Sequence, residues 1–186
     1  CELPGVELVG VADADAATAE RAGKAYGVAH FATPEALFAA VHPDAVTVAA
    51  PTMAHLPIAL TALEHGAHLL VEKPMTDTSA SATELVQLAQ RKNCVLQVGH
   101  VERFNPIFKY LESVATEPRF IETHRLSPYP ARSTDIGVVL DLMIHDLDVV
   151  LAFVKSSVAS VDAVGIPVLS KSEDIANARI RFANGC

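Results

Sequence analysis

The sequence predicts an α/β protein, in which a doubly wound parallel sheet is followed by a second domain with a mainly antiparallel sheet. Two observations carry this prediction. Short apolar segments alternate with helix-like segments through the first 100 residues, as they do where helices join parallel strands. After His100 this alternation stops, and two strand-like segments follow a long apolar helix. We therefore expect two domains, residues 1–100 and residues 101–186.

The first domain contains five apolar segments that we interpret as strands. They are residues 7–13, 30–32, 45–50, 68–71 and 94–99. Helix-like segments lie between them, at residues 14–26, 34–41, 54–65 and 78–92. Glycines end two of these helices, and threonines begin the other two. Each helix-like segment thus has a start or stop signal of its own.

The second domain opens with a predicted helix at residues 104–113. Residues 119–126 alternate between polar and apolar side chains, which is typical of a half-exposed strand. A loop rich in proline and serine covers residues 127–137, and a long apolar helix is expected at 138–154. Strands at 158–168 and 175–183, joined by a polar turn, complete the pattern.

Composition excludes several classes of protein. The chain has 186 residues, of which 51% are hydrophobic, and a formal net charge of -8. It has no basic block, so a nucleic-acid partner is not expected. No apolar run approaches the roughly 20 residues of a membrane span. Three cysteines, an odd number, argue against a disulfide framework. We expect a cytoplasmic protein.

Asp13 stands where the first apolar segment ends and a helix begins. In dinucleotide-binding folds, a carboxylate at this place accepts a hydrogen bond from the 2'-hydroxyl of the adenosine ribose. It also repels a 2'-phosphate, which favours NAD over NADP. A helix cap is the alternative role for Asp13, and Asp15 can share either role.

The glycine loop that holds the pyrophosphate in such folds is missing from this sequence. No G-x-G-x-x-G occurs, and Gly5 and Gly10 do not replace it. We expect that the sequence begins after a first strand, its loop and a helix. That strand would be central in the sheet, and NAD would therefore bind this chain weakly or not at all.

Two strand ends carry candidate binding residues. Residues 72–74 read Glu-Lys-Pro, and they put the Lys73 ammonium at the carboxyl edge of the sheet, where open α/β proteins bind ligands. Turn geometry alone also explains a strand that stops at Lys-Pro. At the end of the preceding strand, Ala50, Pro51, Thr52 and His55 can face a ligand, or Pro51 and Thr52 can simply begin the next helix.

Asp141, His145 and Asp148 lie at spacings of four and three on the long predicted helix. This spacing puts all three on one helix face. The carboxylate of Asp141 can orient the imidazole of His145 and favour its protonated form, an arrangement suited to acid–base catalysis. Two alternatives are a metal site, for which other ligand motifs are missing, and a simple intrahelical ion pair.

Taken in order, these motifs resemble one family of oxidoreductases. AAPTxxH, VEKP, VGHVERFNP and DLMIHDLD follow a strand that ends in an acid, and the set is similar to the Gfo/Idh/MocA family, named for glucose-fructose oxidoreductase and inositol dehydrogenase. The resemblance implies an N-terminal Rossmann domain that binds NAD or NADP, a C-terminal domain with a mainly antiparallel sheet, and a homo-oligomer.

The resemblance also implies roles for particular residues. Lys73 corresponds to the lysine of the family's EKP motif, and Asp141 and His145 correspond to its Asp-x-x-x-His pair. These three are the expected catalytic residues: His145 as general base, Lys73 holding the hydroxyl, and Asp141 orienting the histidine. The roles of the lysine and the histidine can exchange. Ala50, Pro51, Thr52, His55, Glu72 and Pro74 are expected to line the cofactor site together with Asp13 and Lys73.

The residues of the later motifs, GHVERFNP, Arg125-Leu126-Ser127-Pro128 and DLMIHDLDVV, resemble those of one branch of the family. This branch oxidises the 3-hydroxyl of UDP-N-acetylglucosamine. Its two phosphates need cations, and Arg103, Arg125 and Arg132 are the expected ones. Surface ion pairs with nearby acids are the alternative role for these arginines. Two other functions stay open: a dehydrogenase of inositol or a free sugar, and a non-catalytic sensor of NAD or a sugar nucleotide.

Overall fold

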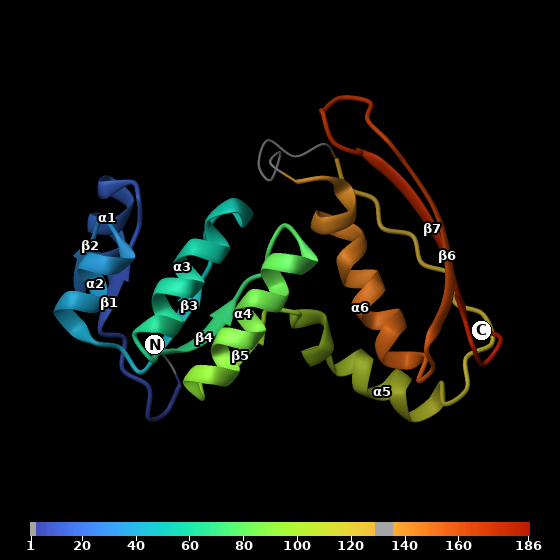
Figure 1. The fold of residues 1–186 in the computed structure, drawn as a ribbon, viewed down its shortest axis with the longest axis horizontal. Coiled ribbons are helices and arrows are strands. Elements are labelled where there is room, and N and C mark those ends of the chain that lie inside the picture. Colours follow the sequence, from blue (N-terminus) through green and yellow to red (C-terminus); the bar gives the residue numbers. More distant parts are fainter. Residues whose placement is uncertain (1–2, 129–135) are drawn as a thin grey trace. The chain divides into compact units, whose positions relative to one another are not determined.

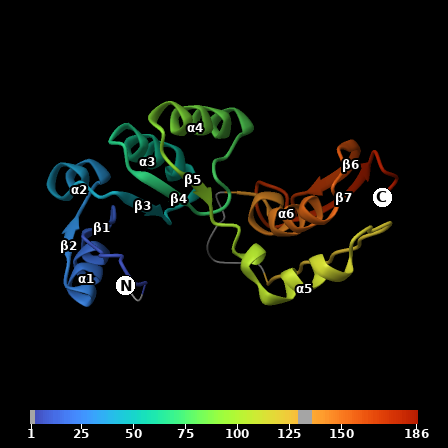
Figure 2. The same cartoon turned by 90° about the horizontal axis from the view of Figure 1, so that it is seen from below.

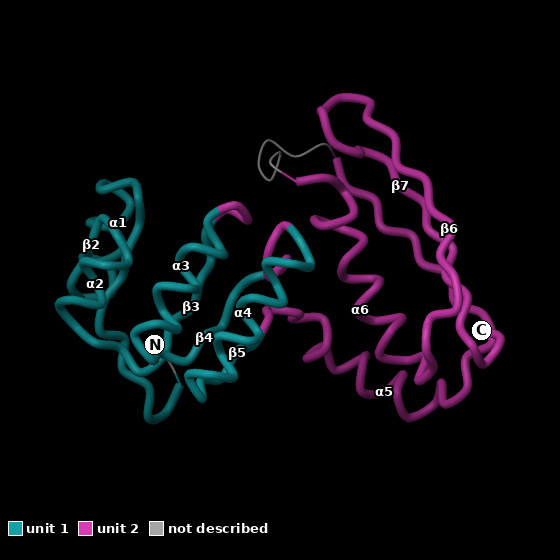
Figure 3. The backbone as a smooth tube through the Cα atoms, viewed as in Figure 1, with its two compact units in different colours: residues 1–50, 54–72, 78–97 teal, residues 51–53, 73–77, 98–186 magenta. Residues whose placement is uncertain are grey.

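The computed structural model describes residues 3–128 and 136–186 (Figure 1). The chain divides into two compact units, coloured separately in Figure 3. Unit 1 comprises residues 1–50, 54–72 and 78–97. Unit 2 comprises residues 51–53, 73–77 and 98–186. The segment 73–77, which begins with Lys73, therefore belongs to the same unit as the long helix of the second half.

The first part of unit 1 is a short parallel pair of strands with two helices. Strand β1 (Gly10–Ala12) pairs in parallel with β2 (Ala29–Phe31). Helix α1 (Ala16–Tyr26) begins where the Asp15 carboxylate accepts from the Thr18 N–H at 3.1 Å. Helix α2 (Pro34–Val41) begins at a proline that follows the capping residue Thr33.

Helix α1 approaches β2 closely at one glycine. A Cβ atom on Gly23 would lie 2.9 Å from the Cβ of His30 and 3.0 Å from the carbonyl oxygen of Val28. Neither atom can be displaced easily, because one belongs to the backbone and the other is a Cβ atom bonded directly to it. Gly23 therefore sets the distance at which α1 packs.

The second part of unit 1 is a three-stranded sheet in the order β3-β4-β5. Its strands are β3 (Ala45–Val48), β4 (His68–Val71) and β5 (Leu96–Val98), and β3 pairs in parallel with β4. Helices α3 (Thr52–Glu64) and α4 (Ser79–Lys92) connect the strands and lie side by side on one face of the sheet (Figure 2). This is the α/β arrangement that the alternating pattern predicted.

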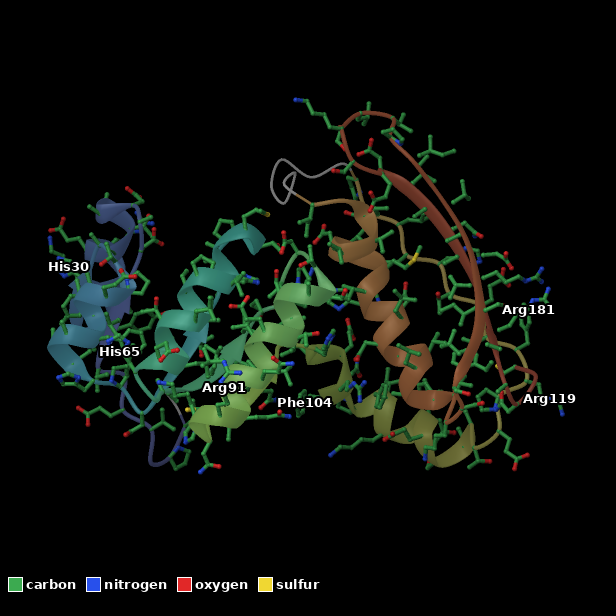
Figure 4. All side chains as sticks on the ribbon, in the orientation of Figure 1. His30, His65, Arg91, Phe104, Arg119 and Arg181 are labelled. Atoms are coloured by element: carbon green, nitrogen blue, oxygen red, sulfur yellow. The ribbon has the colours of Figure 1, made fainter. Side chains whose placement is uncertain are left out.

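Buried side chains from these helices and strands form the core of unit 1. Leu63, Leu85 and Val71 are fully buried. The ring of Phe38 on α2 is buried as well and stacks on the imidazole of His65 at 4.7 Å between centroids (His65 is labelled in Figure 4). The core thus joins α2 to the end of α3.

The parallel strands form two sheets rather than one continuous sheet. Strand β1 is hydrogen-bonded only to β2, and β3 only to β4, among the described residues. A single doubly wound sheet would place a strand between β1 and β3. The parallel strand directions are as predicted.

Unit 2 contains the remaining helices. The 3₁₀ turn η1 (Val101–Phe104) precedes α5 (Pro106–Val114), which Asn105 caps. The helix predicted from residue 104 therefore begins later, because Pro106 favours the first helical position. Next comes one helical stretch with wide π turns at η2 (Val139–Met143), continuing as α6 (Ile144–Phe153). The ring centroids of Phe108 and Phe153 lie 5.0 Å apart, and this contact packs α5 against α6.

An antiparallel hairpin of β6 (Val158–Ile166) and β7 (Ile175–Phe182) completes unit 2, as predicted. The strand predicted at residues 119–126 is wrong, since this segment has no strand structure. Phe120 and Leu126 are 75% and 93% exposed. An alternating pattern needs a neighbouring strand to become a ladder, and this segment has none in the described part of the chain.

No helix among the described residues is both long enough and apolar enough to cross a membrane.

Candidate active site

Lys73 follows the last strand residue of β4 by two positions. The N–H of Glu72 still bonds to the carbonyl of Val48 at 2.9 Å, so the ladder ends just before the lysine. Pro74 follows through a cis peptide bond and is buried. Because proline has no N–H to continue the ladder, the chain leaves the sheet at this point.

The ammonium of Lys73 binds Asp141, 68 residues further along the chain. Its Nζ donates to the carboxylate Oδ1 of Asp141 at 3.0 Å and to the backbone carbonyl of the same residue at 2.7 Å. The two side chains are only 18% and 23% exposed. Two predicted catalytic residues are therefore in direct, partly buried contact within unit 2.

Asp141 lies in the π-helical part of its helix. The N–H of Ile144 donates to the carbonyl of Val139, five residues back, instead of the usual four. Such wide turns occur often at functional sites. Here they alter the regular spacing on which the expected Asp141–His145 pair depended.

His145 has a different environment from the one expected. Its Nδ1 is buried and has no hydrogen-bond partner among the described residues, so Asp141 does not orient the ring through this atom. Burial lowers the pKa of His145, and the charges of Lys73 and Arg125 lower it further. The expectation of a favoured protonated form is wrong, because this histidine is partly buried and lies near two cations. A neutral imidazole is the form that can accept a proton.

Arg125 and Arg103 both bind carboxylates on α6. Arg125 donates from Nε and Nη2 to Oδ1 of Asp146 at 3.1 and 3.0 Å. Arg103 donates to both oxygens of Asp148, each at 2.7 Å, and this contact lowers the pKa of Asp148. These contacts are the ion pairs that we gave as the alternative role. The third predicted phosphate ligand, Arg132, lies outside the described residues.

His100 adds a second imidazole near Asp148. Its Nδ1 is 3.9 Å from Oδ2 of Asp148 and has no hydrogen-bond partner among the described residues. His100 belongs to the motif VGHVERFNP, but the motif alone predicted no role for it. Its distance from Asp148 depends on the tertiary fold, and the spacing along the chain does not reveal it.

The predicted cofactor residues divide into exposed and buried ones. Asp13 is exposed after β1, and its Oδ1 accepts from the N–H of Asp15 at 2.8 Å. Asp15, rather than Asp13, caps α1. His55 is only 1% exposed, and its Nε2 contacts the carbonyl oxygen of Ala50 at 2.8 Å. This histidine is part of the core and does not present an open face to a ligand.

Thr52 is also buried, at 8% exposure, and begins α3, whereas Pro51 is exposed. Glu72 is half-buried. No group of three or more histidine, cysteine or acidic side chains in residues 3–128 and 136–186 is arranged to hold a metal ion. Asp141, His145 and Asp148 each have a different environment, so they do not form a shared ligand set.

Comparison with known proteins identifies the family. The profile described as "Oxidoreductase family, NAD-binding Rossmann fold", that of Gfo/Idh/MocA, matches residues 1–100. The chain belongs to this family.

Two relatives illustrate where the chain stands in the Gfo/Idh/MocA family. UDP-N-acetylglucosamine 3-dehydrogenase from Acidithiobacillus ferrooxidans is 37% identical over 180 residues, which are 96% of this chain and 57% of the relative. Inositol 2-dehydrogenase from Corynebacterium glutamicum strain R is 31% identical over 166 residues, 85% of this chain and 49% of the relative. The chain thus spans about half the length of these relatives.

Two solved structures are similar to this fold. The Acidithiobacillus ferrooxidans enzyme superimposes with a TM-score of 0.87 over 96% of this chain and 59% of its own. An NAD-binding protein from Listeria innocua, 30% identical, gives a TM-score of 0.83 over 96% of this chain and 57% of its own. The parallel strands with their helices and the following antiparallel hairpin are therefore shared with these solved structures.

Proposed function

We propose that the protein is an NAD-dependent dehydrogenase that oxidises a secondary hydroxyl group of a nucleotide sugar. The preferred substrate in this proposal is UDP-N-acetylglucosamine, which is oxidised at its 3-hydroxyl. The observation that carries this proposal is the pairing of Lys73 with Asp141 beside a histidine whose pKa is lowered. Family membership and the 37% identity to a UDP-N-acetylglucosamine 3-dehydrogenase support it.

Oxidation of a secondary alcohol requires that a hydride leave the carbon and a proton leave the oxygen. NAD, when bound, accepts the hydride. The neutral imidazole of His145 accepts the proton, and the Lys73 ammonium stabilises the negative charge that develops on the oxygen. Asp141 holds Lys73 through two oxygen atoms. Its role in this proposal is to position the lysine rather than the histidine.

The residues of the chain fit part of an NAD site. The carboxylate of Asp13 is exposed at the carboxyl end of β1, where a ribose hydroxyl can donate to it. Lys73 follows the carboxyl end of β4, the edge of such sheets at which ligands bind. Asp13 also favours NAD over NADP. The sequence has no G-x-G-x-x-G to hold a pyrophosphate.

Turnover assays with single variants test the catalytic roles. With NAD at millimolar concentration, UDP-N-acetylglucosamine should yield NADH, and Lys73→Ala or His145→Ala should lower kcat by about 100-fold or more. Lys109→Ala and His124→Ala, which remove an exposed lysine and an exposed histidine, are the matched controls. Full turnover by either site variant would refute the mechanism.

A second candidate substrate is inositol or a free sugar. It is favoured by the finding that Arg103 and Arg125 already bind carboxylates on α6. Ionic strength separates the two, because salt weakens phosphate contacts by screening them. The KM for a nucleotide sugar should rise with salt, and Arg125→Ala should raise it further. A KM that is indifferent to both changes would favour the uncharged substrate.

A further inference from the structure

One side chain of the hairpin loop, that of Glu173, contacts the start of the helix that carries Asp141 and His145. The N–H of Val138 donates to the Glu173 carbonyl at 2.8 Å, and the N–H of Val139 donates to its Oε1 at 3.4 Å. The first N–H groups of a helix have no acceptor within the helix. Glu173 supplies two such acceptors from a distant part of the chain.

Two glycines leave the space that this side chain occupies. A Cβ atom on Gly137 would overlap both carboxylate oxygens of Glu173. On the other side, a Cβ atom on Gly165 would lie 3.0 Å from the Cβ of Glu173. The stem of Glu173 therefore lies against β6, and its carboxylate lies on the backbone at the helix start. A negative charge at this end of a helix is also favourable.

The backbone that presents Glu173 is itself well fixed. The adjacent Asp174 accepts through Oδ2 from the N–H groups of Val168, Leu169 and Ser170 at 2.6 to 2.9 Å. The N–H of Asp174 also bonds to the carbonyl of Ile166 at 3.0 Å. Glu173 thus projects from a loop that has an internal hydrogen-bond network.

A short chain of contacts leads from Glu173 to Lys73. The N–H of Asp141 donates to the carbonyl of Gly137 at 3.1 Å. Asp141 in turn offers its carbonyl and its carboxylate to the Lys73 ammonium. A shift of residues 137–139 would therefore move both oxygens to which Lys73 is bound.

We propose that Glu173 is a positioning residue: it fixes the first turn of the helix so that Asp141 holds Lys73 in place for reaction. The proposal rests on the dehydrogenase function proposed above. It assigns a role in that reaction to a residue of the hairpin, far along the sequence from the three catalytic candidates. Glu173 itself need not touch the substrate.

Amide hydrogen exchange tests the structural part without any need for turnover. Glu173→Ala should speed exchange at position 139 by about tenfold, because its amide loses the side-chain acceptor. Gly137→Ala should do the same, because a methyl group displaces the carboxylate. Glu173→Gln keeps an acceptor oxygen and should restore most of the protection. Asp162→Ala, at an exposed position of β6, is the control and should leave exchange at position 139 unchanged.

Kinetics test the functional part. Glu173→Ala should lower kcat by about tenfold and leave KM for the sugar within about twofold, because the reacting groups are misplaced while the substrate still binds. Glu173→Gln should recover most of the rate. Unchanged exchange at 139, or raised exchange there with an unchanged kcat, would overturn the proposal.

The two proposals can fail separately. If the wild-type protein oxidises no alcohol at all, the proposed function fails. The positioning role is then decided by hydrogen exchange together with the NMR signal of the His145 imidazole. Glu173→Ala should shift that signal and Asp162→Ala should not. An imidazole signal that is indifferent to Glu173→Ala would overturn the inference on its own.

Discussion

The imidazole of His145 lies near positive charges. Burial is the main cause of its lowered pKa, and the ammonium of Lys73 is the next. The protonated imidazole is therefore disfavoured, and the neutral base persists to lower pH than in an ordinary histidine, whose pKa is about 6.5. This single residue accounts for the expected pH behaviour of the site.

The first prediction concerns the titration of His145. Its imidazole should titrate below about 6.5 by NMR, with the signal assigned by its loss in His145→Asn. Lys73→Met removes the ammonium and should raise this pKa, although burial should still keep it below the ordinary value. The acid limb of the kcat/KM profile of the wild type should follow the same pKa. A midpoint above about 7 would contradict this account.

The second prediction concerns the pair of Arg103 and Asp148. The Asp148 side chain is 11% exposed and that of Arg103 is 46% exposed. Solvent screening limits the contribution of the pair, and Arg103→Ala should lower the free energy of unfolding by about 1 kcal/mol. Urea denaturation measures this change, and a double-mutant cycle with Asp148→Asn isolates the contribution of the pair.

The sign of the pH dependence follows from the lowered pKa of Asp148. The stabilisation should be complete above the ordinary aspartate pKa of about 3.9 and lost as the pH falls through the lower pKa of the folded state. Arg103→Ala should weaken this acid sensitivity. A coupling free energy between Arg103 and Asp148 that stays the same from neutral to strongly acidic pH would rule out an ion pair as its source.

At the scale of single elements, the hairpin loop depends on one carboxylate. Three N–H groups bind Asp174, and they lower its pKa strongly. Asp174→Asn should therefore speed amide exchange at residues 168–170, because the amide oxygen is a weaker acceptor than a carboxylate. In the wild type the same amides should lose protection as the pH falls below the ordinary aspartate pKa. Ser172→Ala is a neighbouring control.

Local signals in the sequence were enough to place most of the elements. Helix α2 and strand β4 have the predicted bounds, because Thr33, Pro34 and the Glu-Lys-Pro end of β4 are local start and stop signals. The strand expected at residues 119–126 was wrong, since a ladder needs a partner strand that its own residues do not encode. The π turns at Val139–Met143 were also missed, because the pattern assumes regular helical spacing.

The site was less predictable than the elements. Lys73, Asp141 and His145 could be selected from motifs, and the contact between Lys73 and Asp141 is present. Which carboxylate each arginine binds depends on how the segments after β5 fold back on α6. The role proposed for Glu173 depends on contacts with two glycines that are distant in sequence. Neither kind of contact leaves a periodic signal.

At the scale of the whole molecule, the division of the parallel strands into two sheets bears on cofactor affinity. Neither β1 nor β3 has a second strand partner among the described residues. The sequence also has no glycine loop for the pyrophosphate. Calorimetric titration of the 186-residue chain with NAD should therefore show weak binding, in the millimolar rather than the micromolar range. Tight binding would show that other residues hold the pyrophosphate.

The close approach at Gly23 has a consequence for comparing sequences across the family. At position 23 of α1, the Cβ of His30 and the carbonyl oxygen of Val28 leave room for a hydrogen atom but not for a side chain. A relative with the same short connection between this helix and strand should therefore keep glycine at the aligned position. A relative with a larger residue there should have a longer connection or a displaced helix. Position 23 can thus serve as a structural marker for checking alignments of distant members.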